Sequence, residues 1–191
     1  MNKVKYGFKS LYYAKATIAT DGSATYSTPK AWPGAISISL DAEGERSPLR
    51  ADNMDYWVGQ ANNGYNGDLV TALIPEDFRK DILGEVVDSA GAIVEASDIQ
   101  PSPFALLFQF EGDEKATRHV LYNCSASRPT LGGQTTEDTV EAQTETLSIK
   151  AGQIYVPAIS HNVVKSRLTQ STSSTYTSWF SAVHVPAGLG S

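Results

Sequence analysis

A strict two-residue alternation of apolar and small polar side chains, AISISL over residues 35–40, is the feature that most constrains the fold of this chain. Successive side chains of a β-strand point to opposite faces of the sheet, so this period predicts a strand with one buried and one solvated face. The apolar row that we expect on the core consists of Ile36, Ile38 and Leu40. The polar row consists of Ser37 and Ser39.

Other segments carry similar signals, and the chain is predicted to be mainly β. Residues 3–14 are rich in aromatic residues, and residues 144–150 alternate again. Residues 104–110 and 119–124 are apolar on nearly both faces and are joined by a polar turn, which predicts a central hairpin buried on both sides. Within it, Cys124 is expected to act as a small buried hydrophobe.

One short helix is predicted over about residues 75–83. Pro75 suits the first helical position, acids follow it in the first turn, and Gly84 provides a left-handed stop. The apolar stripe that should pack on the sheet consists of Phe78, Ile82 and Leu83. A second short helix is predicted near residues 173–183, because aromatic residues recur there at helical spacing after a Ser/Thr-rich run.

The chain has the length of one domain, and we expect a single domain over residues 1–191. Val/Ile pairs flank turn residues within 86–94, which predicts a small hairpin. The polar stretches 41–55 and 127–143 are expected to be long irregular excursions, and residues 186–191 a flexible tail. Loops of this length are usually functional or disordered.

The formal charge of −6 is unevenly distributed. Residues 51–100 carry ten acids and two bases, whereas residues 151–191 carry two bases and no acid. No Lys/Arg cluster with interleaved aromatic residues occurs, which argues against tight nucleic-acid binding. A single cysteine cannot form an internal disulfide, and no apolar run approaches membrane-spanning length, so we expect a cytoplasmic protein with no membrane partner.

Standard catalytic and cofactor motifs are missing from the sequence, including the phosphate-binding glycine loop, the nucleophile elbow and paired Cys-x-x-Cys. The three histidines are far apart, so we expect no metal site. Glu111, Asp113 and Glu114, and separately Asp52 and Asp55, could suggest the carboxylate pair of a glycosidase, but they lie in or near predicted turns, where solvated carboxylates are common. We therefore expect neither an enzyme nor a bound cofactor.

Several stretches in a fixed order carry a family resemblance: NNGYNGDLVTALIPEDFRKDILGE, PSPFALLFQFEGDEKATRHVLYNCSASRP and EDTVEAQTETLSI, with KVKYGFKSLYYA and SISLDAEGE before them. Over about the first 150 residues the chain resembles the major tail proteins of bacteriophages with long, non-contractile tails. The resemblance implies a β-sandwich or barrel-like tail-tube fold with one packed helix. It does not extend to residues 153–191.

The resemblance also implies a structural virion protein whose copies form hexameric rings that stack into a hollow tube. Such a tube encloses a tape-measure protein during assembly, meets tail terminator and distal tail proteins at its ends, and conducts DNA without binding it. The subunit is made in the host cytoplasm and ends in the phage tail.

Two groups of residues are candidate sites for this assembly. A ring-stacking arm is expected to order against a neighbouring ring, and polar side chains are expected to line the channel, where carboxylates would repel phosphates. The arm candidates are Asp41, Glu43, Glu45, Arg46, Leu49, Arg50, Asp52 and Asp55. The channel candidates are Ser37, Ser39, Asp52, Asp55 and Asp68, with Asp41 and Glu43 also considered. The alternative is that these acids only keep the free subunit soluble.

Two other functions are compatible with the sequence. A tube protein of a contractile tail or secretion system would share the architecture and differ in an outer surface bound by a sheath. A capsid-decorating or carbohydrate-binding module would use exposed Trp32, Trp57 and Trp179 as sugar platforms. Glycan binding by a stable monomer would favour the module, and ring formation without ligand would favour the tube.

Overall fold

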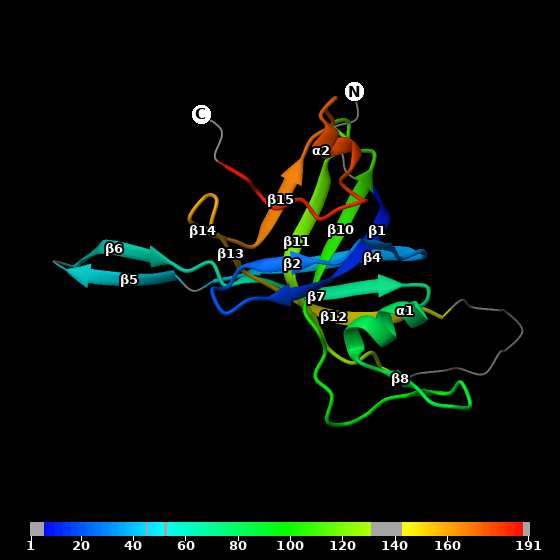
Figure 1. Cartoon of the computed structure of the whole chain (residues 1–191). Helices are drawn as coiled ribbons and strands as arrows, with labels where there is room; N and C mark the ends of the chain where they lie inside the picture. The colour runs from blue at the N-terminus through cyan, green and yellow to red at the C-terminus, as the bar shows by residue number, and fades with distance from the viewer. Residues whose placement is uncertain (1–5, 45, 52, 131–142, 189–191) are drawn as a thin grey trace, which may run out of the picture.

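The structure is a computed structural model that describes residues 6–44, 46–51, 53–130 and 143–188; within 46–51 and 55–60 it describes the backbone only (Figure 1). The chain is mainly β, as predicted. Its large sheet contains β1 (Tyr6–Ile18), β2 (Ala24–Tyr26), β3 (Lys30–Ala31), β4 (Ala35–Glu43), β7 (Gly64–Thr71), β10 (Phe104–Glu111), β11 (Arg118–Ala126), β12 (Glu145–Gly152) and β15 (Lys165–Leu168). Three separate hairpins are β5 (Arg46–Ala51) with β6 (Met54–Gln60), β8 (Val86–Val87) with β9 (Ile93–Val94), and β13 (Ile154–Val156) with β14 (His161–Val163).

The large sheet folds over on itself at β11. Its nine strands run in the order β2-β1-β10-β11-β12-β7-β4, with β3 added to β1 and β15 added to β11, and all pairings are antiparallel. The first half of β11 pairs with β15 and the second half pairs with β12. In Figure 1, β10, β11 and β15 run across the direction of β7 and β12. The two directions create an inner space between the layers, and the main core fills it.

The predicted helix packs into this inner core. It begins as α1 (Glu76–Phe78), continues as a π-helical turn (η1, Arg79–Leu83) and ends at Gly84, whose φ is 78°. Phe78 is fully buried, and its ring lies 5.0 Å from Tyr13, 4.4 Å from Trp32 and 5.2 Å from Phe104 between centroids. Ile82 and Leu83 are buried with it, so the predicted apolar stripe is confirmed.

Polar contacts fix the same helix to β12. Arg79 Nη2 lies 2.9 Å from Glu145 Oε1, and the second oxygen of this carboxylate accepts the backbone N–H of Ile74 at 2.5 Å. Arg79 also reaches Glu85 at 3.5 Å. One partly buried carboxylate on the sheet therefore holds both the loop before the helix and a residue within it, and such charge-assisted bonds are stronger than neutral ones.

A second core covers the outer side of β10 and β11, which explains why these strands lack a polar row. Leu106 belongs to the inner core and its neighbour Leu107 to the outer one, and both are fully buried. The prediction of a hairpin buried on both faces is confirmed. Cys124 is fully buried as predicted, and this burial raises the pKa of its thiol.

The C-terminal strap, residues 173–188, covers the second core. Its helical turn α2 (Ser174–Thr177) begins at Ser173, whose Oγ accepts the N–H of Tyr176, so the predicted second helix is shorter than expected. Trp179 is 1% exposed and donates from Nε1 to the His119 carbonyl at 3.3 Å. The Tyr122 hydroxyl donates to the His184 carbonyl at 2.8 Å. The sequence left the role of this region open, and the structure gives it a packing role.

One prediction for the strand at 35–40 is wrong. Ile38 and Leu40 pack against the inner core, but Ile36 is 46% exposed. The register of β4 with β7 shifts here, because Ala35 is opposite Thr71 and Ser37 is opposite Val70. This bulge adds one residue to β4 and turns Ile36 away from the core, which a two-residue period cannot reveal.

Candidate assembly surfaces

The predicted irregular arm is a β-hairpin. β4 continues to Glu43, and β5 and β6 then form a two-stranded ribbon that projects from the body of the molecule (Figure 1). Asn53 lies in its turn with φ of 61°, a conformation that asparagine tolerates better than most residues. The expectation of an irregular stretch over 41–55 was therefore wrong, because the backbone pairs with itself through residue 60.

The arm candidates divide between these elements. Asp41 and Glu43 belong to β4 in the body of the sheet rather than to the projection. Backbone positions of the others lie in the hairpin: Arg46, Leu49 and Arg50 are in β5 and Asp55 is in β6. Glu45 and Asp52 lie outside the described residues. The predicted loop 127–143 falls mostly outside them too, as does the end of the predicted tail.

The two ends of this hairpin lie close together where it joins the body of the molecule. The backbone N–H of Asn63 donates to the Glu43 carbonyl at 2.9 Å, and a Cβ placed on Gly44 would clash with the Ala61 carbonyl oxygen. The chain thus leaves and re-enters the body at almost one point, which makes the hairpin a separable projection.

Polar side chains cover the solvent side of β4, β7 and β12. Cross-strand pairing sets Ser39 opposite Asp68 and Asp68 opposite Ser148, and the Ser148 hydroxyl donates to Asp68 Oδ1 at 2.7 Å. The polar residues of this surface, which we call the polar sheet face, are Ser37, Ser39, Asp41, Glu43, Asn66, Asp68, Thr146, Ser148 and Lys150, and partly buried Val70 lies between Ser37 and Thr146. The structure therefore brings together five of the seven channel candidates, which are Ser37, Ser39, Asp41, Glu43 and Asp68. Asp55 lies apart from them, beside the turn of the projecting hairpin.

The polar sheet face carries three carboxylates and one amine. Lys150 Nζ pairs with Glu43 Oε2 at 2.8 Å, which leaves Asp41 and Asp68 without an ion-pair partner among the described residues. Asn66, Thr146, Ser148 and Lys150 were not predicted as members from the sequence, although the alternation at 144–150 already placed Thr146 and Ser148 on the polar row of a strand. What the sequence did not reveal was the pairing of β12 with β7.

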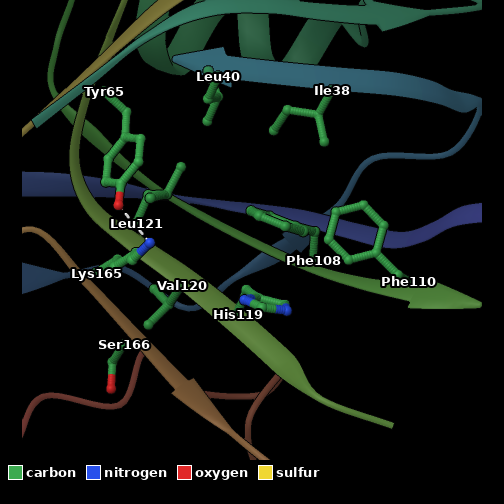
Figure 2. A pocket seen from close by; sticks show the side chains of 10 residues that line it. All are labelled: Ile38, Leu40, Tyr65, Phe108, Phe110, His119, Val120, Leu121, Lys165 and Ser166. Atoms are coloured by element: carbon green, nitrogen blue, oxygen red, sulfur yellow. Dashed lines mark hydrogen bonds between the residues drawn. The ribbon is translucent and has the colours of Figure 1, made fainter. Parts of the chain in front are cut away.

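An apolar groove of about 240 Å³ opens where β15 and β12 diverge from β11. Figure 2 shows its two sides: Ile38 and Leu40 from β4 face Phe108 and Phe110 from β10. His119 stacks on Phe108 with 5.2 Å between ring centroids. The two layers of the folded sheet are thus not closed against each other here.

A basic rim borders this groove along β15. Lys165 crosses to the other layer, where its Nζ donates to the Tyr65 hydroxyl and lies 4.4 Å from the centroid of that ring (Figure 2). Arg167 lies opposite His119 in the β11–β15 pairing. Neither cation has a carboxylate partner within the described residues.

The structure gives other roles to four of the eight residues that the sequence alone could suggest as catalytic or sugar-binding. Glu111 pairs with Lys9 at 3.3 Å, and Asp113 accepts the backbone N–H groups of Lys115 and Thr117, which shapes the β10–β11 turn. Trp32 and Trp179 are each 1% exposed and form core contacts, so neither is a sugar platform. The side chain of Trp57 lies outside the described residues.

Among the described residues, no group of three or more His, Cys, Asp or Glu side chains is arranged to hold a metal ion. Within the same residues, no helix has the length and apolar character needed to cross a membrane. Comparison with protein-family models and with curated proteins gives no match to this chain.

Proposed function

We propose that this chain is the major tail tube subunit of a long, non-contractile phage tail. Its copies form hexameric rings, the rings stack into a tube around a tape-measure protein, and the tube conducts DNA. The observation that carries the proposal is one sheet that combines a solvent-facing polar surface with a hairpin projecting from its edge. The family resemblance of residues 1–149 supplies the specific assembly.

The polar sheet face suits the wall of a DNA channel. Its three carboxylates outnumber its single amine, Lys150. A wall that carried unpaired Lys or Arg would release counterions from phosphates and hold the DNA, whereas Asp41 and Asp68 repel it. The same surface on the outside of the tube would contradict this role.

The β5–β6 hairpin suits the contact between rings. It carries its own backbone hydrogen bonds along the ribbon, yet two-stranded ribbons are marginal when isolated in water. Docking on a neighbouring ring would stabilise it, which couples the order of the hairpin to growth of the tube.

Excision of this hairpin tests the proposal. Replacement of residues 45–60 with a two-glycine linker should leave the body folded, because Gly44 and Ala61 already approach each other closely. We expect a variant that still unfolds cooperatively but forms no stacked tubes. Tubes that form as readily as those of the unmodified chain would rule out the hairpin as the stacking element.

The contractile-tube reading remains a second proposal, since both kinds of tube would share this architecture. The two differ in whether a sheath protein binds the outer surface. The carbohydrate-binding module loses its main support, because two of its three proposed tryptophan platforms are buried.

A further inference from the structure

The β8–β9 hairpin exposes four β-branched aliphatic side chains. Val86, Val87, Ile93 and Val94 are 48%, 50%, 36% and 43% exposed. Val86 lies opposite Val94, and Val87 lies opposite Ile93. Successive cross-strand pairs point to opposite faces, so this short ribbon is apolar on both sides. Exposed aliphatic side chains gathered on one short element make this hairpin a candidate interaction site.

The same segment is negatively charged. Residues 85–98 contain four acids and no base. Glu85 and Glu95 are paired with arginines, whereas Asp88, at the turn, has no cationic partner among the described residues. Its Oδ1 accepts the N–H groups of Ala90 and Ala92 at 2.8 Å each, which fixes the turn and holds the charge at the tip.

The groove between the sheet layers has the complementary properties. Its two walls are apolar, with Ile38 and Leu40 on one side and Phe108 and Phe110 on the other. Its rim carries Lys165, which lines the groove, and Arg167, which lies opposite the lining residue His119; neither has a carboxylate partner among the described residues. The ribbon has two apolar faces that can contact the two apolar walls of the groove. Its acidic tip is complementary in charge to the basic rim.

The hairpin lies away from the β15 side of the groove in its own chain. In Figure 1, β8 lies at the bottom of the molecule, beyond β12 and α1, whereas β15 lies near the top. Contact between the two surfaces therefore joins different copies head to tail. Such a heterologous contact closes into a ring or continues as a filament, according to the rotation between copies.

We propose that the β8–β9 hairpin of one copy docks in the groove of a second copy of this chain. Asp88 then approaches Lys165 and Arg167, and the four aliphatic side chains are covered by the two walls. This inference rests on the proposed self-assembly and names the surfaces that carry it.

Disulfide trapping tests the contact directly. The natural cysteine, Cys124, is fully buried and leaves the surface free for designed pairs. A chain that carries both Ala90→Cys, at the hairpin tip, and Arg167→Cys, at the groove rim, should give a ladder of dimers, trimers and higher species after mild oxidation. Each single variant should give at most a dimer, because a chain with one accessible cysteine can form only one disulfide to another chain.

The outcomes separate this inference from the proposed function. A ladder supports the head-to-tail contact. Rings or tubes seen by electron microscopy without a ladder overturn the contact and leave the tube proposal standing. A chain that stays monomeric at high concentration and gives no ladder contradicts both.

An apolar-to-polar pair of substitutions provides a second test. Val86→Thr with Val94→Thr keeps the branched shape and the strand propensity of each side chain and replaces one methyl group with a hydroxyl, which reduces the apolar surface. We expect the concentration needed for assembly to rise by about tenfold or more, since each tenfold corresponds to about 1.4 kcal/mol. Leu73→Thr is the matched control, because Leu73 is 66% exposed outside the hairpin. Equal effects of the two changes would contradict a specific contact.

Discussion

Ser148 donates a hydrogen bond to Asp68 across the β7–β12 pairing, with 2.7 Å between Oγ and Oδ1. The two residues are 80 positions apart in sequence and meet on the solvent side of the sheet. The bond orients a carboxylate outward without neutralising it. This arrangement provides the negative wall that the proposed channel needs.

Reversal of that charge should turn the wall into a DNA-binding surface. Asp68→Lys places an amine on the polar sheet face next to Lys150, so assembled tubes should bind DNA that enters them. The measurement is co-sedimentation of short DNA with assembled tubes at low salt, and the bound DNA should be released as salt is raised. Glu114→Lys, in the exposed β10–β11 turn, is the control that adds the same charge elsewhere. If both variants bound equal amounts of DNA, the prediction that Asp68 faces the channel would be contradicted.

Phe78 should be essential for the fold, because its ring lies among three aromatic partners in the inner core. Phe78→Ala should lower the free energy of unfolding by about 3–5 kcal/mol, the usual cost of removing a buried aromatic side chain. Urea denaturation of the free subunit measures this change in the free energy of unfolding. Ile36→Ala, at the exposed bulge, should change stability by only about 0.5 kcal/mol. A large loss at Ile36 would show that the bulge is packed in solution.

The C-terminal strap should contribute to stability through Trp179. Trp179→Ala removes a fully buried indole and its bond to the His119 carbonyl, and the expected loss is again about 3–5 kcal/mol. Dye binding should also increase as the outer core opens. Ser181→Ala, on the exposed side of the same strap, is the control. Unchanged stability of the Trp179 variant would mean that the strap is not closed over β10 and β11.

Stability should decrease as the pH falls through the titration range of His184. Burial against Trp179 lowers the pKa of His184 below its usual value of 6.5. The unfolded chain then binds the proton more readily than the folded chain. The stability that neutral His184 contributes to the folded state is therefore complete above pH 6.5, and it is lost as the pH falls through the pKa of His184 in the folded chain. Denaturation at pH 7.5 and 5.5 should show a smaller pH difference in His184→Gln than in the unmodified chain. An identical difference in both proteins would assign the pH dependence to other groups.

The sequence correctly predicted those elements whose pattern lies within one short stretch of residues. The alternation at 144–150 placed Leu147 and Ile149 on the core, and Gly84 ended the helix at the expected residue. The bulge at Ile36 was missed because it depends on the register with β7, a partner that the residues of β4 do not reveal. The β5–β6 hairpin was missed because its polar composition suggested a loop, although Asn53 is a suitable turn residue.

The candidate surfaces were predicted only in part, for the same reason. Period-two patterning identified Ser37 and Ser39 as solvent-facing, but only the strand order sets them beside Asp68 and Ser148. The groove and its basic rim required knowledge that β11 pairs with β12 over one half and with β15 over the other. Lys165 and Tyr65, which meet across it, are 100 residues apart.

Electron microscopy of the purified chain at high concentration distinguishes a tube subunit from a monomeric protein. We expect stacked rings with sixfold symmetry and an open axial channel, with the polar sheet face on the channel wall and the β5–β6 hairpins between rings. A protein that remains monomeric at all concentrations, or tubes whose channel wall excludes Ser39, Asp68 and Ser148, would contradict this expectation.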